Sequence, residues 1–331
     1  MRILIAPDKF KGTASAREAA DAIGNALGHQ HTLELQPMAD GGEGTLEVFG
    51  GPNRINVVNG PLNTPVEASW RLHGDFAVIE MSKSSGLMLV GGSKHNDPVA
   101  ATTFGTGQLM STAIERGARK ILVGAGGSAT TDGGFGALEA LQPLQRIREV
   151  SITVACDVRT PFIKAAEVFG PQKGASPSEV KFLRRRLERL VQIYLDDRGV
   201  DVSTLEMAGA AGGLAGGLAS VGANLVNGFE AVAETVDLLH SIEQADLVIT
   251  GEGFVDASSF DGKVVGGILE LARETNTPAF VIAGGWNPDV PCTAPVYSLE
   301  NEVGRKNAYE KTKQSIELTA KKAFSDWEKR R

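Results

Sequence analysis

Apolar runs along this chain alternate with segments rich in glycine and polar residues. The run at residues 2–6 predicts a strand. Apolar positions at helical spacing after it predict a helix, at whose start Ser15 and Glu18 form a capping box. A second strand at residues 32–38 leads into glycines that begin at Gly41. Strands that alternate with helices in this way indicate a parallel sheet with helices on its faces.

The middle of the chain contains longer, strand-like runs. Residues 55–58, 66–72 and 76–81 are separated by Gly-Pro and Gly-Asp turns and predict antiparallel strands. This change of rhythm places a domain boundary near Pro61. Further along, a capping box that begins at Ser176 predicts the start of a long helix.

Strand–helix alternation returns near the C-terminus, where predicted strands at residues 245–250 and 279–283 each run into glycines. We therefore predict that both ends of the chain, residues 1–60 and 235–331, form one α/β domain. Residues 61–234 are predicted to form a second α/β domain inserted between them.

The glycine-rich loop at residues 120–134, KILVGAGGSATTDGG, is the most informative stretch. A buried strand runs directly into glycines, with Ser128, Thr130 and Asp132 between them. Glycines allow a ligand to approach main-chain N–H groups closely, which suits a phosphate or a carboxylate. A tight structural turn is the alternative interpretation of this loop.

Acidic residues follow several predicted strands in the same way. In open α/β sheets, ligands bind outside the carboxyl ends of the strands, where such loops converge. Phosphoryl transfer requires carboxylates that hold Mg²⁺ against phosphate oxygens, together with glycine N–H groups and lysines. The pattern therefore favours a site for a metal ion and a phosphate. The acids that follow strands are Asp8, Asp40 with Glu43, Asp132, Asp157, and Glu252 with Asp256.

Two common nucleotide-binding motifs fit poorly. Gly262-Lys263 is followed by Val264, where a Walker A loop has Ser or Thr. Residues 124–129 match the G-x-G-x-x-A pattern of a dinucleotide-binding fold, but the TTDGG that follows is a poor helix start. A dinucleotide-dependent oxidoreductase is kept as an alternative enzyme class.

Composition argues against several other classes of protein. The formal net charge is −7 without a basic stripe, which argues against a nucleic-acid partner. Two distant cysteines, Cys156 and Cys292, form no disulfide framework and fit a reduced cytosol, so we expect a cytoplasmic protein. Residues 207–229 carry no charge but are rich in Gly and Ala, so we expect no membrane span.

Short motifs rich in glycine, acids and lysines occur along almost the whole chain. They are APDKFKG at residues 6–12, PMADGGEGT at 37–45, TTFGTG at 102–107, GGSAT at 126–130 with DGG at 132–134, ACD at 155–157, FGPQKG at 169–174, and TGEG at 250–253 with Asp256 and Gly262-Lys263. In this order they resemble the motifs of the type I glycerate kinase family, and so many motifs in one order are highly specific to it.

The resemblance implies an enzyme that phosphorylates D-glycerate with ATP and Mg²⁺ and usually gives 2-phosphoglycerate. It also implies a flavodoxin-like, doubly wound parallel-sheet domain built from both chain ends. A second α/β domain would be inserted into it, with the active site in the cleft between the two. The expected partners are small-molecule substrates, and the expected assembly is a monomer or a homodimer.

Candidate roles follow for the residues of these motifs. Lys11 is the candidate for binding the carboxylate of glycerate, and Asp157 or Asp132 for orienting and deprotonating the attacking hydroxyl. Lys173 or Lys263 would offset the charge that develops on the transferred phosphoryl group. The candidate ligands of Mg²⁺ or of its waters are Asp40, Glu43 and Glu252. The candidates for substrate and phosphate binding are Asp8, Gly126, Gly127, Ser128, Thr130, Lys173, Gly251, Gly253 and Lys263.

Two departures from the family pattern bear on function. The chain is shorter than its relatives after the helix that follows the glycine-rich loop, where Leu141 runs through Pro143 to the strand at Ser151. Phe254-Val255 stands where relatives often have Arg-Leu. The alternative from a different class is therefore a non-catalytic, small-molecule-binding homologue, against which the retained acids argue.

Overall fold

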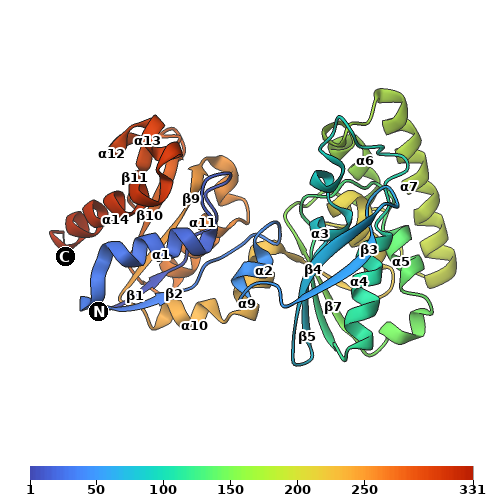
Figure 1. Cartoon of the computed structure of the whole chain (residues 1–331), viewed down its shortest axis with the longest axis horizontal. Helices are drawn as coiled ribbons and strands as arrows, with labels where there is room; N and C mark the ends of the chain where they lie inside the picture. The colour runs from blue at the N-terminus through green and yellow to red at the C-terminus, as the bar shows by residue number, and fades with distance from the viewer. Residues whose placement is uncertain (331) are drawn as a thin grey trace. The chain divides into compact units, whose positions relative to one another are not determined.

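The computed structural model describes residues 1–330, and the chain divides into two compact units. Met1–Asp40 and Val232–Arg331 form the first unit, and Gly41–Ala231 form the second unit. Both units are built around a β-sheet with helices packed against it (Figure 1).

The first unit contains a five-stranded, fully parallel sheet in the order β11-β10-β9-β1-β2. Counted along this unit, the strand order is 2-1-3-4-5, which is the flavodoxin-like order, and the predicted doubly wound fold is confirmed. The chain leaves β1 toward one edge of the sheet and β9 toward the other, so the topological switch point lies between these two strands. The strands are β1 (Arg2–Ile5), β2 (Thr32–Leu35), β9 (Leu247–Val255), β10 (Ala279–Trp286) and β11 (Val296–Ser298).

Helices cover both faces of this sheet. Ile3, Ile23 and Phe324 share the core between the sheet, α1 and α14, whereas Val265 and Val281 share the core beneath α11. The helices are α1 (Ala16–Leu27), α10 (Leu238–Glu243), α11 (Val264–Glu274), α12 (Leu299–Val303), α13 (Arg305–Glu310) and α14 (Thr312–Glu328), with the 3₁₀ turns η1 (Gly28–Gln30) and η7 (Ala257–Phe260). The capping box of Ser15 and Glu18 at the start of α1 is confirmed.

Strands β9 and β10 extend beyond their predicted ends. They remain paired as far as Val255, which lies opposite Trp286. A Cβ atom on Gly251 would collide with the carbonyl oxygen of Ile282, so glycine is required where these two backbones approach closely. The glycines that were expected to form a loop therefore lie inside a strand, and Glu252 is part of β9.

The second unit contains a six-stranded sheet in the order β3-β4-β5-β6-β7-β8. The antiparallel pairing predicted for β3, β4 and β5 is confirmed, and β5 to β8 are parallel. Because β3 pairs with β4, the boundary between the units follows Asp40 instead of lying near Pro61. The strands are β3 (Arg54–Asn59), β4 (Pro65–His73), β5 (Phe76–Glu80), β6 (Lys120–Gly124), β7 (Ser151–Cys156) and β8 (Asn224–Asn227).

Helix α7 is the longest element of the second unit. It begins at the predicted capping box of Ser176 with Glu179, and it buries Leu183, Leu187 and Tyr194 in the core. The helices are α2 (Thr45–Val48), α3 (Ser82–Ser85), α4 (Phe104–Glu115), α5 (Phe135–Ala140), α6 (Ala165–Phe169), α7 (Pro177–Arg198), α8 (Leu214–Ala219) and α9 (Gly228–Thr235), the last of which contains the second boundary. The 3₁₀ turns are η2 (Leu87–Val90), η3 (Leu144–Ile147), η4 (Phe162–Lys164), η5 (Pro171–Lys173) and η6 (Ala210–Gly213).

The uncharged segment at residues 207–229 forms several short elements, among them η6, α8 and β8. Leu214 and Leu218 of this segment are fully buried in the core of the second unit. Within residues 1–330, the structure has no helix that is both long enough and apolar enough to cross a membrane.

Candidate active site

Charged groups gather at the switch point of the first unit. Asp8 follows β1, and its main-chain N–H donates to the carbonyl oxygen of Gly251 on β9 at 2.8 Å. This bond holds the loop after β1 against the strand that carries Glu252. Ligands of doubly wound sheets bind at the carboxyl ends of the strands at the switch point, so Asp8 and Glu252 occupy the position expected of a binding site.

The carboxylates at this switch point perturb one another. Burial raises the pKa of Asp8 to about 6, and the neighbouring charge of Asp40 adds to the shift. Burial likewise raises the pKa of Glu252 to about 7, with a further contribution from Asp8. Within the described residues, Glu252 Oε1 is buried and accepts no hydrogen bond. An orphaned carboxylate oxygen beside a second carboxylate is the environment that a cation would stabilise.

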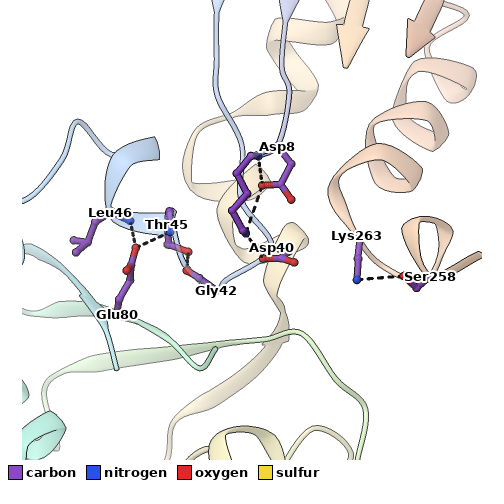
Figure 2. A network of polar contacts seen from close by, with 10 residues as sticks. Asp8, Asp40, Gly42, Thr45, Leu46, Glu80, Ser258 and Lys263 are labelled. Atoms are coloured by element: carbon purple, nitrogen blue, oxygen red, sulfur yellow. Dashed lines mark hydrogen bonds and ion pairs between the residues drawn. The ribbon is translucent and has the colours of Figure 1, made fainter. Parts of the chain in front are cut away.

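Two lysines moderate this negative charge. Lys9 Nζ lies 3.7 Å from Asp8 Oδ1 and 3.6 Å from Asp40 Oδ1 (Figure 2). Lys263 Nζ lies 3.4 Å from the hydroxyl of Ser258, and its charge lowers the pKa values of both Asp8 and Glu252. The structure therefore brings Asp8, Glu252 and Lys263 together, as the sequence predicted for residues at neighbouring strand ends.

Other predicted residues of the first unit have clear structural surroundings. Asp256 accepts hydrogen bonds from the N–H of Ser258 at 2.8 Å and from its hydroxyl at 2.7 Å, and it caps η7. Gly253 packs against the loop after β1, because a Cβ there would lie 3.0 Å from the main-chain nitrogen of Lys11. The side chain of Lys11 is exposed. Asp256 is thus a local cap.

The predicted metal ligands are distributed over both units. Asp40 belongs to the first unit with Glu252, whereas Glu43 is exposed and belongs to the second unit. Within residues 1–330, the structure groups no three His, Cys, Asp or Glu side chains in an arrangement that could hold a metal ion. The assignment of Asp40, Glu43 and Glu252 to Mg²⁺ stays a prediction.

The second unit has a cavity of about 350 Å³ at the carboxyl ends of β6 and β7. It lies among the loop after β6, the residues after β7, η2, and the segment from Phe169 to Lys173. Five of the predicted site residues line it: Gly126, Gly127, Ser128, Asp157 and Lys173. Its other lining residues are Leu87, Met88, Ala125, Val158, Phe169, Gln172 and Ala211.

The glycine-rich wall of this cavity leaves main-chain donors without acceptors. The N–H groups of Gly126, Gly127 and Ser128 donate no hydrogen bond to any described residue. Gly127 has a φ of +73°, and a Cβ on Gly126 would lie 2.7 Å from the Cα of Gly42, so both positions favour glycine. Successive N–H groups around a left-handed residue form a concavity that suits an anion.

Lys173 is the buried cation of this cavity. Lys173 is only 3% exposed, and its Nζ donates a hydrogen bond to the carbonyl oxygen of Thr130 at 2.7 Å. Burial lowers the pKa of Lys173 to about 7, against the opposing effects of Asp132 and Asp157. The amide of Asn96 donates to the carbonyl oxygen of Lys173 at 2.9 Å and fixes its backbone. An anion in the cavity would restore the charge of this lysine.

Asp132 occupies a different environment from Asp157. One carboxylate oxygen of Asp132 accepts hydrogen bonds from the N–H and the hydroxyl of Thr103, both at 2.8 Å, and the other accepts from the N–H of Gly134 at 3.1 Å. These bonds tie the glycine-rich loop to the start of α4. Asp132 does not line the cavity, whereas Asp157 is exposed and does. Thr130 is fully buried, and it contributes its carbonyl oxygen to Lys173 rather than its hydroxyl to the cavity.

Sequence reasoning missed Glu80, at the end of β5. This residue is 2% exposed, and its Oε1 accepts hydrogen bonds from the N–H groups of Leu46 at 2.8 Å and Gly44 at 3.1 Å (Figure 2). Its Oε2 is buried without a hydrogen-bond partner among the described residues and lies 3.8 Å from Lys83 Nζ. Burial raises the pKa of Glu80. The sequence does contain a signal for Glu80, because it is an acid at the end of an apolar strand. That strand was expected only to pair in antiparallel fashion, so its parallel pairing with β6, which places Glu80 at the carboxyl edge of the parallel strands, was not anticipated.

The first helix after the glycine-rich loop, α5, begins at Phe135. Residues 124–129 therefore do not open a helix, as the dinucleotide-binding fingerprint requires. This geometry gives no support to the oxidoreductase alternative.

The sequence of this chain is similar to those of known proteins along most of its length. The sequence model of the glycerate kinase family matches residues 3–143 and 142–328. The chain is 38% identical to the glycerate 2-kinase of Escherichia coli K12, over 88% of this chain and 87% of that protein. It is also 38% identical to the glycerate kinase of Halalkalibacterium halodurans, over 85% of each chain.

A solved structure has the same fold. The crystal structure of a Salmonella typhimurium LT2 protein described as glycerate kinase 2 superposes with a TM-score of 0.84 and 34% identity. The alignment covers 99% of this chain and 98% of that one. The two matches to the family model meet at residues 142–143, where the chain was predicted to be shorter than its relatives.

Proposed function

This chain belongs to the glycerate kinase family, and we propose that it transfers the γ-phosphoryl group of ATP to a hydroxyl group of D-glycerate with Mg²⁺. The expected product is 2-phosphoglycerate. The observation that carries the proposal is a family match over nearly the whole chain, whose motifs supply charged groups at the carboxyl ends of parallel strands in both units. Such groups are what phosphoryl transfer requires.

The cavity of the second unit is proposed to bind phosphate groups. The N–H groups of Gly126, Gly127 and Ser128 would donate to phosphate oxygens, and Lys173 would offset the charge that develops on the transferred group. A buried lysine with a pKa of about 7 responds strongly to an anion, because the phosphate charge favours its protonated form. Lys173 is therefore expected to be charged when phosphate is bound.

Asp157 is proposed as the general base. It lines the cavity, beside Lys173, and is accessible to a bound hydroxyl. The oxygens of Asp132 are already engaged by N–H and hydroxyl donors, so Asp132 is proposed to hold the loop in shape. Asp157 would accept the proton of the attacking glycerate hydroxyl.

Asp8 and Glu252 are proposed as the groups of the first unit that hold Mg²⁺. Their raised pKa values and the buried Oε1 of Glu252, which has no hydrogen-bond partner among the described residues, would suit a cation, and carboxylate oxygens are the protein ligands that Mg²⁺ prefers. Asp40, which pairs with Lys9, lies beside Asp8 and adds to the negative charge there. Bound Mg²⁺ supplies positive charge to phosphate oxygens. Lys263 is proposed to complement that charge.

The first test is an ADP-release assay coupled to NADH oxidation, with ATP, Mg²⁺ and D-glycerate, followed by ³¹P NMR of the product. We expect ADP release that depends on glycerate and a phosphate signal from the C2 position. The matched controls omit glycerate or replace it with L-glycerate. If wild-type protein binds ATP or glycerate but shows no turnover, the non-catalytic homologue is the correct reading. If it binds neither, the functional proposal is wrong.

A further inference from the structure

The cavity of the second unit has an apolar end as well as an anion-binding end. Leu87, Met88, Val158 and Phe169 line it, and they come from η2, from the residues after β7 and from the end of α6. Met88 is 83% exposed although it lines the cavity. Methionine is flexible and polarisable, and it suits an apolar wall that closes on a flat ligand.

This combination does not match a small hydroxy acid. D-glycerate carries polar oxygens on every carbon, and burying them against four apolar side chains without hydrogen bonds would be unfavourable. The cavity volume of about 350 Å³ also falls within the range of pockets for larger cofactors, which are mostly apolar with a few placed polar groups. A ligand with a flat apolar part and an anionic part fits both ends.

We propose that this cavity binds the adenosine portion of ATP, with the adenine ring against Leu87, Met88, Val158 and Phe169. The phosphates then extend along the N–H groups of Gly126, Gly127 and Ser128 toward Lys173. This inference rests on the proposed function, since it takes ATP as the phosphoryl donor. It assigns the donor, and not glycerate, to the apolar cavity of the second unit.

The apolar and anionic walls are parts of one hydrogen-bonded frame. The N–H of Leu87 donates to the carbonyl oxygen of Gly127 at 2.9 Å, and the N–H of Ala129 donates to the carbonyl oxygen of Ser85 at 3.0 Å. These bonds join the start of η2 to the glycine-rich loop as an isolated antiparallel bridge between Gly86 and Ser128. The spacing between the adenine wall and the phosphate loop is thereby set before a nucleotide binds.

The experiment compares Met88→Asp with the control Leu89→Asp. Leu89 follows Met88 in η2 and is 40% exposed, but it does not line the cavity. Both changes place a carboxylate on an exposed side chain of the same 3₁₀ turn. Calorimetric titrations with adenosine, with ADP and with D-glycerate are made on the wild type and both variants, and KM values are measured where turnover exists.

We expect Met88→Asp to weaken adenosine and ADP binding by about ten-fold or more and to raise KM for ATP similarly, with D-glycerate binding unchanged. Leu89→Asp should resemble the wild type. Loss of glycerate binding instead of adenosine binding would assign the cavity to the acceptor and overturn the proposal. Equal effects of both variants, or none from either, would also overturn it.

Direct binding separates this proposal from the functional one. If Met88→Asp weakens adenosine binding but the wild type does not turn over glycerate, the nucleotide cavity is supported and the kinase activity is refuted. If the protein shows glycerate-dependent turnover but Met88→Asp leaves adenosine binding unchanged, the kinase activity is supported and the cavity assignment is refuted.

Discussion

The two units place charged groups at the same structural position, the carboxyl ends of parallel strands, yet their electrostatics are opposite. In the first unit, burial raises the pKa of Asp8 to about 6 and that of Glu252 to about 7. In the second unit, burial lowers the pKa of Lys173 to about 7. Burial disfavours the charged form in both cases, so each unit has a group that a ligand of opposite charge would re-ionise. The first unit is suited to a cation and the second to an anion.

The largest expected effect on this contrast is that of Lys173→Met. We expect kcat to fall by about three orders of magnitude, because the buried cation that is proposed to offset the charge of the transferred phosphoryl group is lost. The melting temperature should change little, since the variant also removes an unfavourably buried charge. Steady-state kinetics and thermal unfolding are compared with Lys181→Met, whose side chain is exposed on α7. A normal kcat in Lys173→Met would refute the anion role of this lysine.

Asp157→Asn and Asp132→Asn separate chemistry from structure within the second unit. We expect Asp157→Asn to lower kcat by about 10²–10⁴ without changing the melting temperature, because the proposed general base is lost from an exposed position. Asp132→Asn should lower the free energy of unfolding by about 2 kcal/mol, because an amide N–H₂ would face the donors of Thr103 or Gly134. Steady-state kinetics and urea unfolding of both variants measure the two effects. The reverse pattern would exchange the two roles.

The pH dependence of stability should have opposite slopes for the two units. Glu252 keeps its proton to about pH 7 in the folded protein but loses it near 4.5 when unfolded. The folded state thus binds more protons between these values, and the free energy of unfolding falls as pH rises through this window. Lys173 titrates near 7 when folded and near 10.5 when unfolded, so its contribution rises with pH between these values.

Urea unfolding at several pH values measures both slopes. Glu252→Gln should remove roughly 1–3 kcal/mol of the fall between about pH 4.5 and 7, and Lys173→Met should flatten the rise above pH 7. Mg²⁺ should stabilise the wild type more at pH 8 than at pH 5, and should not do so in Glu252→Gln. Slopes that survive both substitutions would mean that other groups set the pH dependence.

The last test concerns Glu80, the buried acid of the second unit. Glu80→Ala should lower the free energy of unfolding by about 1–3 kcal/mol, because the N–H groups of Leu46 and Gly44 lose their acceptor. Glu80→Gln keeps an oxygen at that position and should retain most of the stability. Equal losses in the two variants, measured by urea unfolding, would show that the negative charge and not the acceptor is what matters.

Much of the architecture could be predicted from local patterns. The capping boxes of Ser15 and Ser176 and the strands of both sheets other than β8 depend on residues close in sequence or on simple periodicity. The flavodoxin-like topology of the first unit was implied by the family resemblance. The ends of β9 and β10 and the boundary after Asp40 could not, because they depend on strands that pair across long separations. Such pairing overrides the breaking tendency of Gly251 and Gly253.

The candidate site divides in the same way. The sequence by itself determined most of the acids, lysines and glycines that follow strands, because a strand followed by a glycine turn is a local property. Only the tertiary structure decided their surroundings: Asp132 is saturated by donors, Asp157 lines a cavity, and Glu252 lies within a strand. It also showed that Glu80, which the sequence pattern did not single out, ends a parallel strand of the second sheet. Burial and hydrogen bonding depend on neighbours distant in sequence, and these neighbours determine whether a charged group serves the fold or remains available to a ligand.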